Sequence, residues 1–126
     1  MIWKAKLSDS VTYAISRIED VEPWYLVNKK SLVFNNKTNM MTTPVIAITM
    51  NEFDVIIDSD TGVWTGTLNV GIRVAKDNCC MDWTNIDESG LVVNGYMGDS
   101  MSNSNNWTEN NYDYCYQSHR LYCFEQ

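Results

Sequence analysis

Short apolar runs separated by polar turns dominate this chain and predict small strands around one early helix. Ser8 offers a capping hydroxyl, and Asp9 suits the positive end of a helix. Apolar residues then recur at helical spacing, at Val11, Ala14, Ile15 and Ile18. We therefore expect a helix from this cap to about Glu19.

The rest of the chain predicts strands and loops. Pro23 forces an extended exit from the helix, and residues 24–27 and 31–34 have the pattern of two strands joined by a turn at Lys29-Lys30. Residues 35–43 are a polar connection, whereas residues 44–49 and 53–57 are short apolar runs. Further strands are expected at 63–67 and 91–93, with a turn at Gly95 and Gly98 and a Ser- and Asn-rich loop over 99–112.

The last residues, 120–126, predict a strand with a thiol at its centre. Leu121, Cys123 and Glu125 fall on one face, whereas Tyr122 and Phe124 fall on the other. Apolar or aromatic residues on both faces favour a strand that is covered on each side.

Length and charge limit the class of protein. The 126 residues form one domain, 1–126, and 9 basic against 16 acidic residues give a net charge of −7. This charge argues against nucleic-acid partners, which need a clustered basic face. No run of 18 apolar residues predicts a membrane span, and the start of the chain lacks the pattern of an export signal. Four cysteines favour an oxidising compartment and disulfide bonding, so we expect an extracellular or cell-surface location.

Catalytic chemistry is difficult to assemble from these residues. His119 is the single histidine, and we interpret it as a surface residue rather than a general base. Cys115 lies four positions before it, but no third group to orient the pair is evident, so a structural cysteine is the better interpretation. We expect no enzymatic activity and no catalytic residues.

A metal site is also not expected. Asp99, Glu109, Asn110 and Asp113 lie in or beside one polar loop and carry the oxygen ligands that calcium prefers. The Glu-Pro-Asn and Trp-Asn-Asp motifs of calcium-dependent lectins are absent, however. A solvated loop is therefore the better interpretation, and no cofactor is expected.

The five tryptophans suggest a stacking surface for a glycan or peptide. Most of the tryptophans are expected in the core, and Trp107, in the longest polar loop, is the candidate for an exposed ring, because loops carry recognition. The candidate binding surface comprises Asp99, Asn103, Asn105, Asn106, Trp107, Glu109 and Asn110.

Several segments, in order, resemble endostatin, and more closely the bacterial endostatin-like proteins of the leptospires. They are residues 3–10 with Arg17, 23–27, the Trp-Thr-Gly-Thr segment at 64–67, 80–83, 90–98, and Cys115 followed by Cys123 in a Leu-Tyr-Cys-Phe-Glu ending. The resemblance covers most of residues 2–126. It implies an α+β, C-type-lectin-like fold with mixed short strands, one or two helices and long loops. The segment that precedes these motifs in the family is missing, so the fold is expected to be truncated at its N-terminus.

The resemblance also implies a disulfide pairing. Cys80 matches the partner of Cys115, whereas Cys123 matches a cysteine whose partner lies in the missing segment. Cys79 and Cys123 therefore stay unassigned, and a bond between Cys79 and Cys115 stays open. Trp64 and Trp83 match family positions that look structural.

The expected function follows from the resemblance: a non-enzymatic, calcium-independent, adhesin-like binding module, secreted or held on a surface such as an outer membrane. Its expected ligand is a host matrix protein, a complement regulator or a glycan on a host or neighbouring surface. The alternative is a structural or assembly domain of a larger exported protein or phage-like particle.

The missing segment has a consequence for the C-terminal strand. Because the family pairs its first strand with its last, Leu121–Glu125 is expected to have an open edge, and open edges attract other strands. We predict that residues 2–6 fold back onto this edge, or that the protein forms a homodimer through it.

Overall fold

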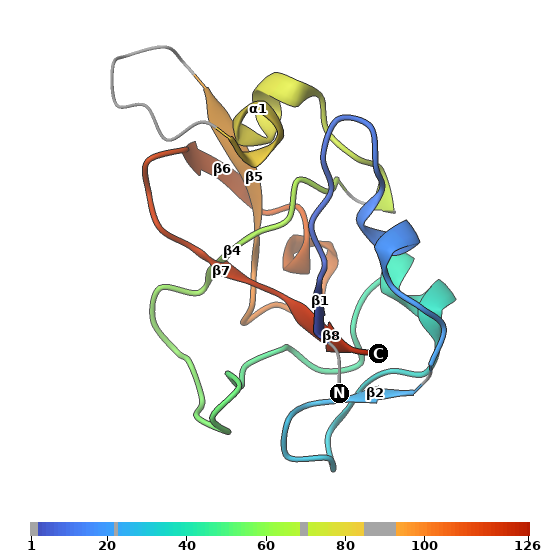
Figure 1. The fold of residues 1–126 in the computed structure, drawn as a ribbon. Helices are drawn as coiled ribbons and strands as arrows, with labels where there is room; N and C mark the ends of the chain where they lie inside the picture. The colour runs from blue at the N-terminus through green and yellow to red at the C-terminus, as the bar shows by residue number, and fades with distance from the viewer. Residues whose placement is uncertain (1–2, 22, 69–70, 85–92) are drawn as a thin grey trace.

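The computed structural model describes residues 3–21, 23–68, 71–84 and 93–126. It is a small mixed fold of short sheets and brief helical turns joined by long loops (Figure 1). The strands are β1 (Trp3–Ala5), β2 (Trp24–Tyr25), β3 (Leu32–Phe34), β4 (Gly62–Trp64), β5 (Asn94–Asp99), β6 (Asn111–Tyr114), β7 (Arg120–Leu121) and β8 (Cys123–Glu125). The helical segments are η1 (Ala14–Arg17), η2 (Lys37–Met41), η4 (Lys76–Asn78), α1 (Cys80–Trp83) and η5 (Asn105–Trp107). The general class of short strands with few helices is as expected.

The largest sheet has the strand order β6-β5-β4-β7. Its neighbours β6, β5 and β4 run antiparallel, whereas β7 joins β4 in parallel, with Val63 opposite Arg120. The strand predicted at 63–67 is therefore confirmed in its first part. Two smaller sheets, β1-β8 and β2-β3, complete the set within the described residues.

The two ends of the chain form one of the small sheets. β1 pairs antiparallel with β8, with Trp3 opposite Glu125 and Ala5 opposite Cys123, and the two strands lie side by side in Figure 1. The amide of Lys6 continues the ladder by donating to the Tyr122 carbonyl at 2.8 Å. The prediction that the start of the chain folds back onto the C-terminal strand is confirmed for residues 3–6; Ile2 lies outside the described residues.

The C-terminal alternation is confirmed, but its expected burial on both faces is wrong. Tyr122 and Phe124 are buried, whereas Leu121, Cys123 and Glu125 are exposed. β8 is paired along one edge and packs only one face on the core. Its other face is open to solvent because no described element covers it.

The predicted helix from Ser8 to Glu19 is wrong, because the first polar side chains form a turn instead. The Asp9 carboxylate accepts from the amides of Val11 and Thr12, and the Ser8 hydroxyl accepts from the amide of Ala14 at 2.7 Å. The Ser8 amide itself donates to the Thr65 carbonyl. Side chains that compete for backbone groups in this way favour a turn over a helix, and only η1 forms.

The hairpin at residues 24–34 is confirmed, although its strands are shorter than predicted. The Asn28 side chain accepts from the amides of Lys30 and Ser31, and Lys29 takes a positive φ of 57° in the turn. The apolar runs 44–49 and 53–57 form no strands. They are linked by a single bridge between Met50 and Ile56, and Phe53 is exposed.

The predicted turn at Gly95 and Gly98 is wrong, because both glycines lie inside β5. A Cβ at Gly98 would lie 1.9 Å from the Trp107 carbonyl oxygen, and one at Gly95 would lie 2.7 Å from the Trp64 ring. Only glycine fits at these two positions of β5, because a side chain would collide with the Trp107 backbone or the Trp64 ring. Of the strand predicted at 91–93, Leu91 and Val92 lie outside the described residues.

The core is centred on the Trp107 ring. It packs against Phe34 and Tyr122, with ring centroids 5.2 Å and 5.4 Å apart, and its indole NH donates to the Thr42 carbonyl at 2.7 Å. Ile18, Leu26, Val33 and Met40 are among the other members of the same buried cluster.

A lysine also lies in this core. Lys6 is only 2% exposed, its Nζ lies 4.3 Å above the Trp107 ring, and it is 3.4 Å from the Thr108 hydroxyl. Burial lowers the pKa of Lys6 from 10.5 to about 7, because the charged ammonium loses its hydration. The free energy needed to charge the buried Lys6 amine reduces the stability of the folded protein.

We predict that Lys6→Met stabilises the protein in a pH-dependent way. The unfolded chain holds the lysine proton up to its ordinary pKa of 10.5, whereas the folded protein releases it near 7, so the penalty is greatest below pH 7 and falls as pH rises. The variant should gain a few kcal/mol at pH 6.5, and this margin should shrink by about 2 kcal/mol at pH 8.5. Urea unfolding at both pH values measures it.

The matched control is Lys4→Met, because Lys4 is partly exposed and paired with Glu19. It should show no comparable change with pH. A margin for Lys6→Met that stays constant between pH 6.5 and 8.5 would contradict the buried, neutralised lysine.

The β1-β8 pairing generates a second prediction. Because Lys6 donates to Tyr122, alternation along β1 directs the Lys4 amide toward β8 and the Ala5 amide away from it. Lys4→Pro should lose this ladder bond, destabilise the protein by about 2 kcal/mol, and promote dimers through the uncovered edge of β8. Ala5→Pro, the matched control, should cost less and leave a monomer. Urea unfolding and sedimentation velocity test both effects, and equal behaviour of the two variants would refute the register.

Candidate functional site

The predicted binding surface over residues 99–110 is formed only in part. Asn103, Asn105, Asn106 and Asn110 are exposed, but Trp107 is 1% exposed and lies in the core, so the expectation of an exposed indole is wrong. Burial of the large indole ring removes apolar surface from water and so stabilises the folded protein. The neighbouring asparagines, Asn105 and Asn106, therefore lie at the surface beside a buried tryptophan.

The same loop is ordered by its own hydrogen bonds. The Asp99 carboxylate, which is half-buried, accepts from the Met101 amide, and the Ser104 side chain caps η5. Glu109 is also half-buried. Asp113, the fourth residue weighed as a calcium ligand, bonds to His119 instead. In the part of the chain that the structure describes, no group of three or more His, Cys, Asp or Glu side chains is placed to hold a metal ion.

A more prominent surface lies beside this loop, on the β5-β6 hairpin. We call it the tyrosine face, and it comprises Tyr96, Tyr112, Tyr114 and Tyr116. Tyr112 and Tyr114 are 58% and 54% exposed. The Tyr114 and Tyr116 rings stack in parallel with centroids 5.6 Å apart, and the Tyr96 and Tyr112 rings lie 6.2 Å apart. Exposed aromatic rings held by one another form a rigid contact surface.

The tyrosines are exposed because the sheet extends beyond the core. Val63 and Thr65 of the neighbouring strand segment are buried, and Thr65 bonds to Tyr96. Tyr112 lies opposite Tyr96 on this same face, but β6 is the outermost strand, where no core residue covers it. In the sequence this surface is marked by the alternation Tyr-x-Tyr-x-Tyr at 112–116. These tyrosines are not among the predicted binding residues, which are centred on Trp107.

The opposite side of the hairpin carries the single histidine. The His119 ring bonds to the Asp113 carboxylate at 2.8 Å and meets the Trp64 ring edge-on at 4.6 Å. It is thus partly buried and not the free surface residue that the sequence suggested. Cys115 is bonded to Cys80, so it offers no thiol to this histidine. The arrangement therefore pairs a histidine with a carboxylate that can orient it, without Cys115 as a nucleophile.

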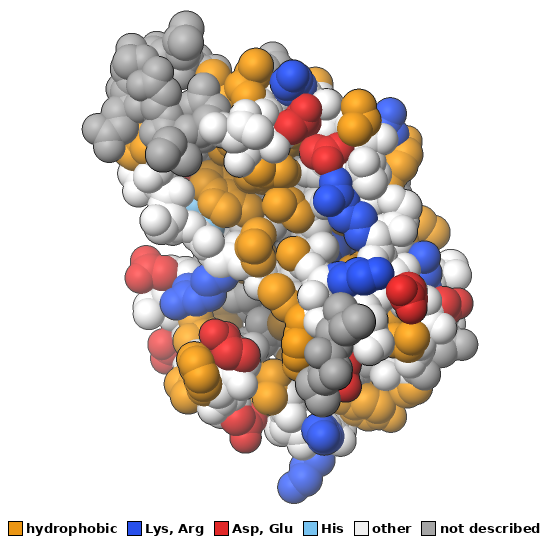
Figure 2. All heavy atoms as spheres, in the orientation of Figure 1, with side chains coloured by type: hydrophobic (Ala, Val, Ile, Leu, Met, Phe, Trp, Pro, Cys, Tyr) orange, Lys and Arg blue, Asp and Glu red, His pale blue; other side chains and the backbone are white. Residues whose placement is uncertain are grey.

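The sheet face around Trp64 is apolar. Trp64 lies opposite Met97 on one side and Leu121 on the other, and the Trp83 ring packs 5.6 Å from it. Figure 2 shows hydrophobic side chains gathered across the middle of one face of the molecule, with charged side chains on either side. The family-matched tryptophans Trp64 and Trp83 are therefore structural neighbours with partly exposed rings.

The disulfide between Cys80 and Cys115 is formed as the resemblance implied, with Cα atoms 5.5 Å apart. It joins α1 to the end of β6. α1 is a single turn in which Cys80, Met81, Asp82 and Trp83 all have positive φ, a conformation that is costly for residues with a Cβ. The disulfide and the contacts of Asp82 and Trp83 hold the turn in place.

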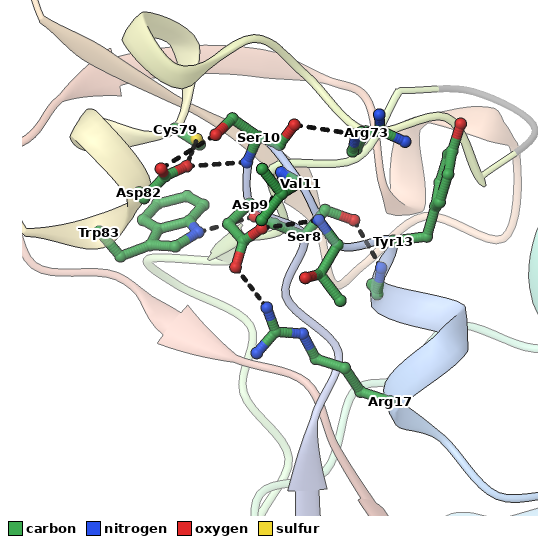
Figure 3. A network of polar contacts seen from close by, with 12 residues as sticks. Ser8, Asp9, Ser10, Val11, Tyr13, Arg17, Arg73, Cys79, Asp82 and Trp83 are labelled. Atoms are coloured by element: carbon green, nitrogen blue, oxygen red, sulfur yellow. Dashed lines mark hydrogen bonds and ion pairs between the residues drawn. The ribbon is translucent and has the colours of Figure 1, made fainter.

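Those contacts form a polar network between α1 and residues 8–17 (Figure 3). The Asp82 carboxylate accepts from the amide and hydroxyl of Ser10, at 2.8 Å and 2.9 Å, and the Trp83 indole NH donates to the Ser8 carbonyl at 2.7 Å. The hydrogen bond from the Ser10 amide is the largest cause that lowers the pKa of Asp82. The network is structural, because its hydrogen bonds join α1 to the segment that begins at Ser8.

The two free thiols differ in setting. Cys79 is buried, and its Sγ lies 3.3 Å from the Asp82 carboxylate. Burial raises the pKa of the Cys79 thiol to about 11, so it stays protonated and weakly reactive. Cys123 is exposed overall, although part of its thiol is shielded from solvent. This partial burial is the larger cause that raises the pKa of the Cys123 thiol, and the negative charge of Glu52 is the smaller one.

Cys123 lines a cavity with a volume of about 640 Å³. The cavity lies between the β2-β3 hairpin and β8, and its walls include Trp24, Leu26, Val33 and Phe124. Its size suits a small apolar ligand. It has few polar groups to orient one, so it ranks behind the tyrosine face as a recognition site.

Comparison with known proteins adds no relative: no family model, curated protein or solved structure matches this chain. Among the described residues, no helix has the length and apolar character needed to span a membrane. The functional argument therefore rests on the surfaces described above.

The disulfide generates a prediction of its own. Cys115→Ser should destabilise the oxidised protein by about 3–4 kcal/mol, because the 35-residue separation closes a long loop in the unfolded chain. Cys123→Ser should change stability by less than about 0.5 kcal/mol, because this thiol is free and exposed. Urea unfolding measures both. Peptide mapping without reductant that shows a Cys79–Cys115 bond would contradict the pairing.

Proposed function

We propose that this chain is a non-enzymatic, calcium-independent binding module that acts outside the cell or at a cell surface. The observation that carries the proposal is the tyrosine face, where Tyr112 and Tyr114 project from an outer strand with more than half of their surface exposed. Its ligand is a protein or a glycan on a neighbouring surface.

Tyrosine is well suited to this role. Its ring supplies a large contact area at a low cost in side-chain entropy, and its hydroxyl supplies a hydrogen bond. The exposed asparagines of the 99–110 loop, at Asn103, Asn105, Asn106 and Asn110, extend the polar part of the surface beside the rings. Rings surrounded by adaptable polar groups are typical of recognition surfaces.

The site chemistry favours binding over catalysis. The Asp113–His119 pair cannot use Cys115 as a nucleophile, because this thiol is used in the disulfide. The disulfide is also what supports an oxidising location, since such bonds persist outside the reducing cytosol.

Membership of the endostatin-like, C-type-lectin-like proteins remains part of the proposal. Two features support it: the Cys80–Cys115 bond, and the fold-back of β1 onto β8, which takes the place that the resemblance gives to the family's first strand.

The second candidate function is an assembly domain of a larger exported protein or particle. The apolar sheet face around Trp64 and the exposed Phe53 and Ile56 favour this alternative, because contiguous apolar surface is typical of permanent interfaces. An assembly domain would bury these residues against copies or neighbours, whereas a binding module would be monomeric with its tyrosine face free.

We predict that Tyr112→Ser combined with Tyr114→Ser abolishes ligand binding without loss of fold. The probes are a printed panel of neutral and acidic glycans and a panel of purified extracellular matrix proteins, each with and without EDTA. Binding should weaken at least tenfold in the double variant, because exposed hot-spot rings dominate such interfaces, and EDTA should have no effect.

Tyr25→Ser is the matched control, since Tyr25 is 48% exposed on a different sheet. Equal losses from both variants, or binding that EDTA removes, would refute the proposal. An obligate oligomer in sedimentation velocity that resists the tyrosine substitutions would favour the assembly domain instead.

A further inference from the structure

We propose that the tyrosine face binds arginine side chains of an extended basic peptide, which adds to the free edge of β6 as a further strand. This inference rests on the proposed binding function and specifies the ligand of the same surface. Charge, ring chemistry and strand geometry each support it.

The charge around the hairpin selects a cation. Residues 77–119 contain seven Asp and Glu residues and no Lys or Arg, and the whole chain carries a net charge of −7. The nearest lysine in sequence, Lys76, has its Nζ 4.0 Å from the Asp82 carboxylate. The negative charge of the chain would therefore attract a basic segment over long range and speed its approach. The same charge disfavours a second copy of this acidic chain as the occupant.

The rings themselves bind cations. The faces of tyrosine rings carry negative electrostatic potential, and guanidinium groups stack on them in preference to ammonium groups. The protein already makes this contact once, with the Arg73 guanidinium centred 4.4 Å from the Tyr13 ring. On the tyrosine face, the exposed rings of Tyr112 and Tyr114 have no such cation among the described residues.

The strand geometry selects an extended peptide. In the described part of the chain β6 is an edge strand with β5 as its neighbour (Figure 1). The outward amides of Tyr112 and Tyr114 already donate to the Asn111 and Asp113 side chains, so a peptide strand would pair with the outward carbonyls of these two tyrosines. Tyr112 and Tyr114 are two residues apart on β6, so they project from the same face about 7 Å apart along the strand. A partner strand with arginines at alternate positions has the same spacing, so each guanidinium meets one ring.

The test uses the full chain and a fluorescent peptide, acetyl-Thr-Arg-Val-Arg-Thr-amide, with binding measured by anisotropy at low and physiological salt. Matched peptides carry citrulline, which has the shape of arginine without its charge, or Lys in place of Arg. The arginine peptide should bind best, the lysine peptide more weakly, and the citrulline peptide weakest. In antiparallel pairing the arginine amides face β6 and the Val amide faces away, so N-methylation of the two arginines should also weaken binding, whereas N-methylation of the central Val should not.

The protein variants separate ring from hydroxyl. Tyr112→Leu and Tyr114→Leu should each weaken binding of the arginine peptide about two- to fivefold, which is the range expected for an exposed cation–π contact. Tyr112→Phe and Tyr114→Phe should bind nearly as well as the native protein, and Tyr25→Leu should have no effect.

Two results would overturn the inference. Equal binding of the citrulline and arginine peptides would show that charge is not recognised. A neutral glycan that binds in a Tyr112-dependent way, with no peptide bound, would leave the binding function standing and exclude this ligand class. Failure of both glycans and peptides to bind would overturn the proposed function itself.

Discussion

The contact on which this fold most depends is the packing of the Trp107 indole in the centre of the molecule. Its ring contacts Phe34 from β3, Tyr122 beside β8 and the buried Lys6 after β1. Its NH bonds to the Thr42 carbonyl, and its own carbonyl accepts from the Tyr122 hydroxyl at 2.8 Å. One residue thus connects the first strand, the last strand and the middle of the chain. Small domains with short elements need such shared contacts, because no single element buries enough surface alone.

The Trp107 contact also positions the candidate site. Gly98 allows the Trp107 backbone to lie directly against β5, so the loop that leaves β5 is held down before it returns as β6. The β5-β6 hairpin is therefore fixed to the core at the end near Gly98 and Trp107. Tyr112 and Tyr114 lie on the outer strand, β6, where the core does not cover them. Recognition surfaces gain affinity when they are ordered before the ligand arrives, and the ring contacts between Tyr114 and Tyr116 supply that order here.

The sequence predicted strands and their turns better than it predicted burial. The hairpin at 24–34 and the Cys80–Cys115 bond were expected, because turn residues and the family resemblance mark them, and the fold-back of β1 was one of two alternatives for the C-terminal edge. The helix at Ser8 failed because Asp9 and Ser8 bond to nearby amides and because the Ser8 amide pairs with Thr65, a partner 57 residues later that no local pattern shows. Trp107 was placed in solvent because its neighbours are polar. Its burial depends on Phe34 and Tyr122, which only the tertiary fold brings to it.

The antiparallel pairing of the two chain ends has a mechanical consequence. Trp3 lies opposite Glu125, so the first and last residues of the β1-β8 ladder are neighbours and the two termini leave from the same end of it. A pulling force between the termini would load the hydrogen bonds of the ladder one after another, as in a zipper, instead of all together in shear. Force would therefore separate β1 from β8 early, expose the edge of β8 that β1 covers, and draw Lys6 away from the Trp107 ring.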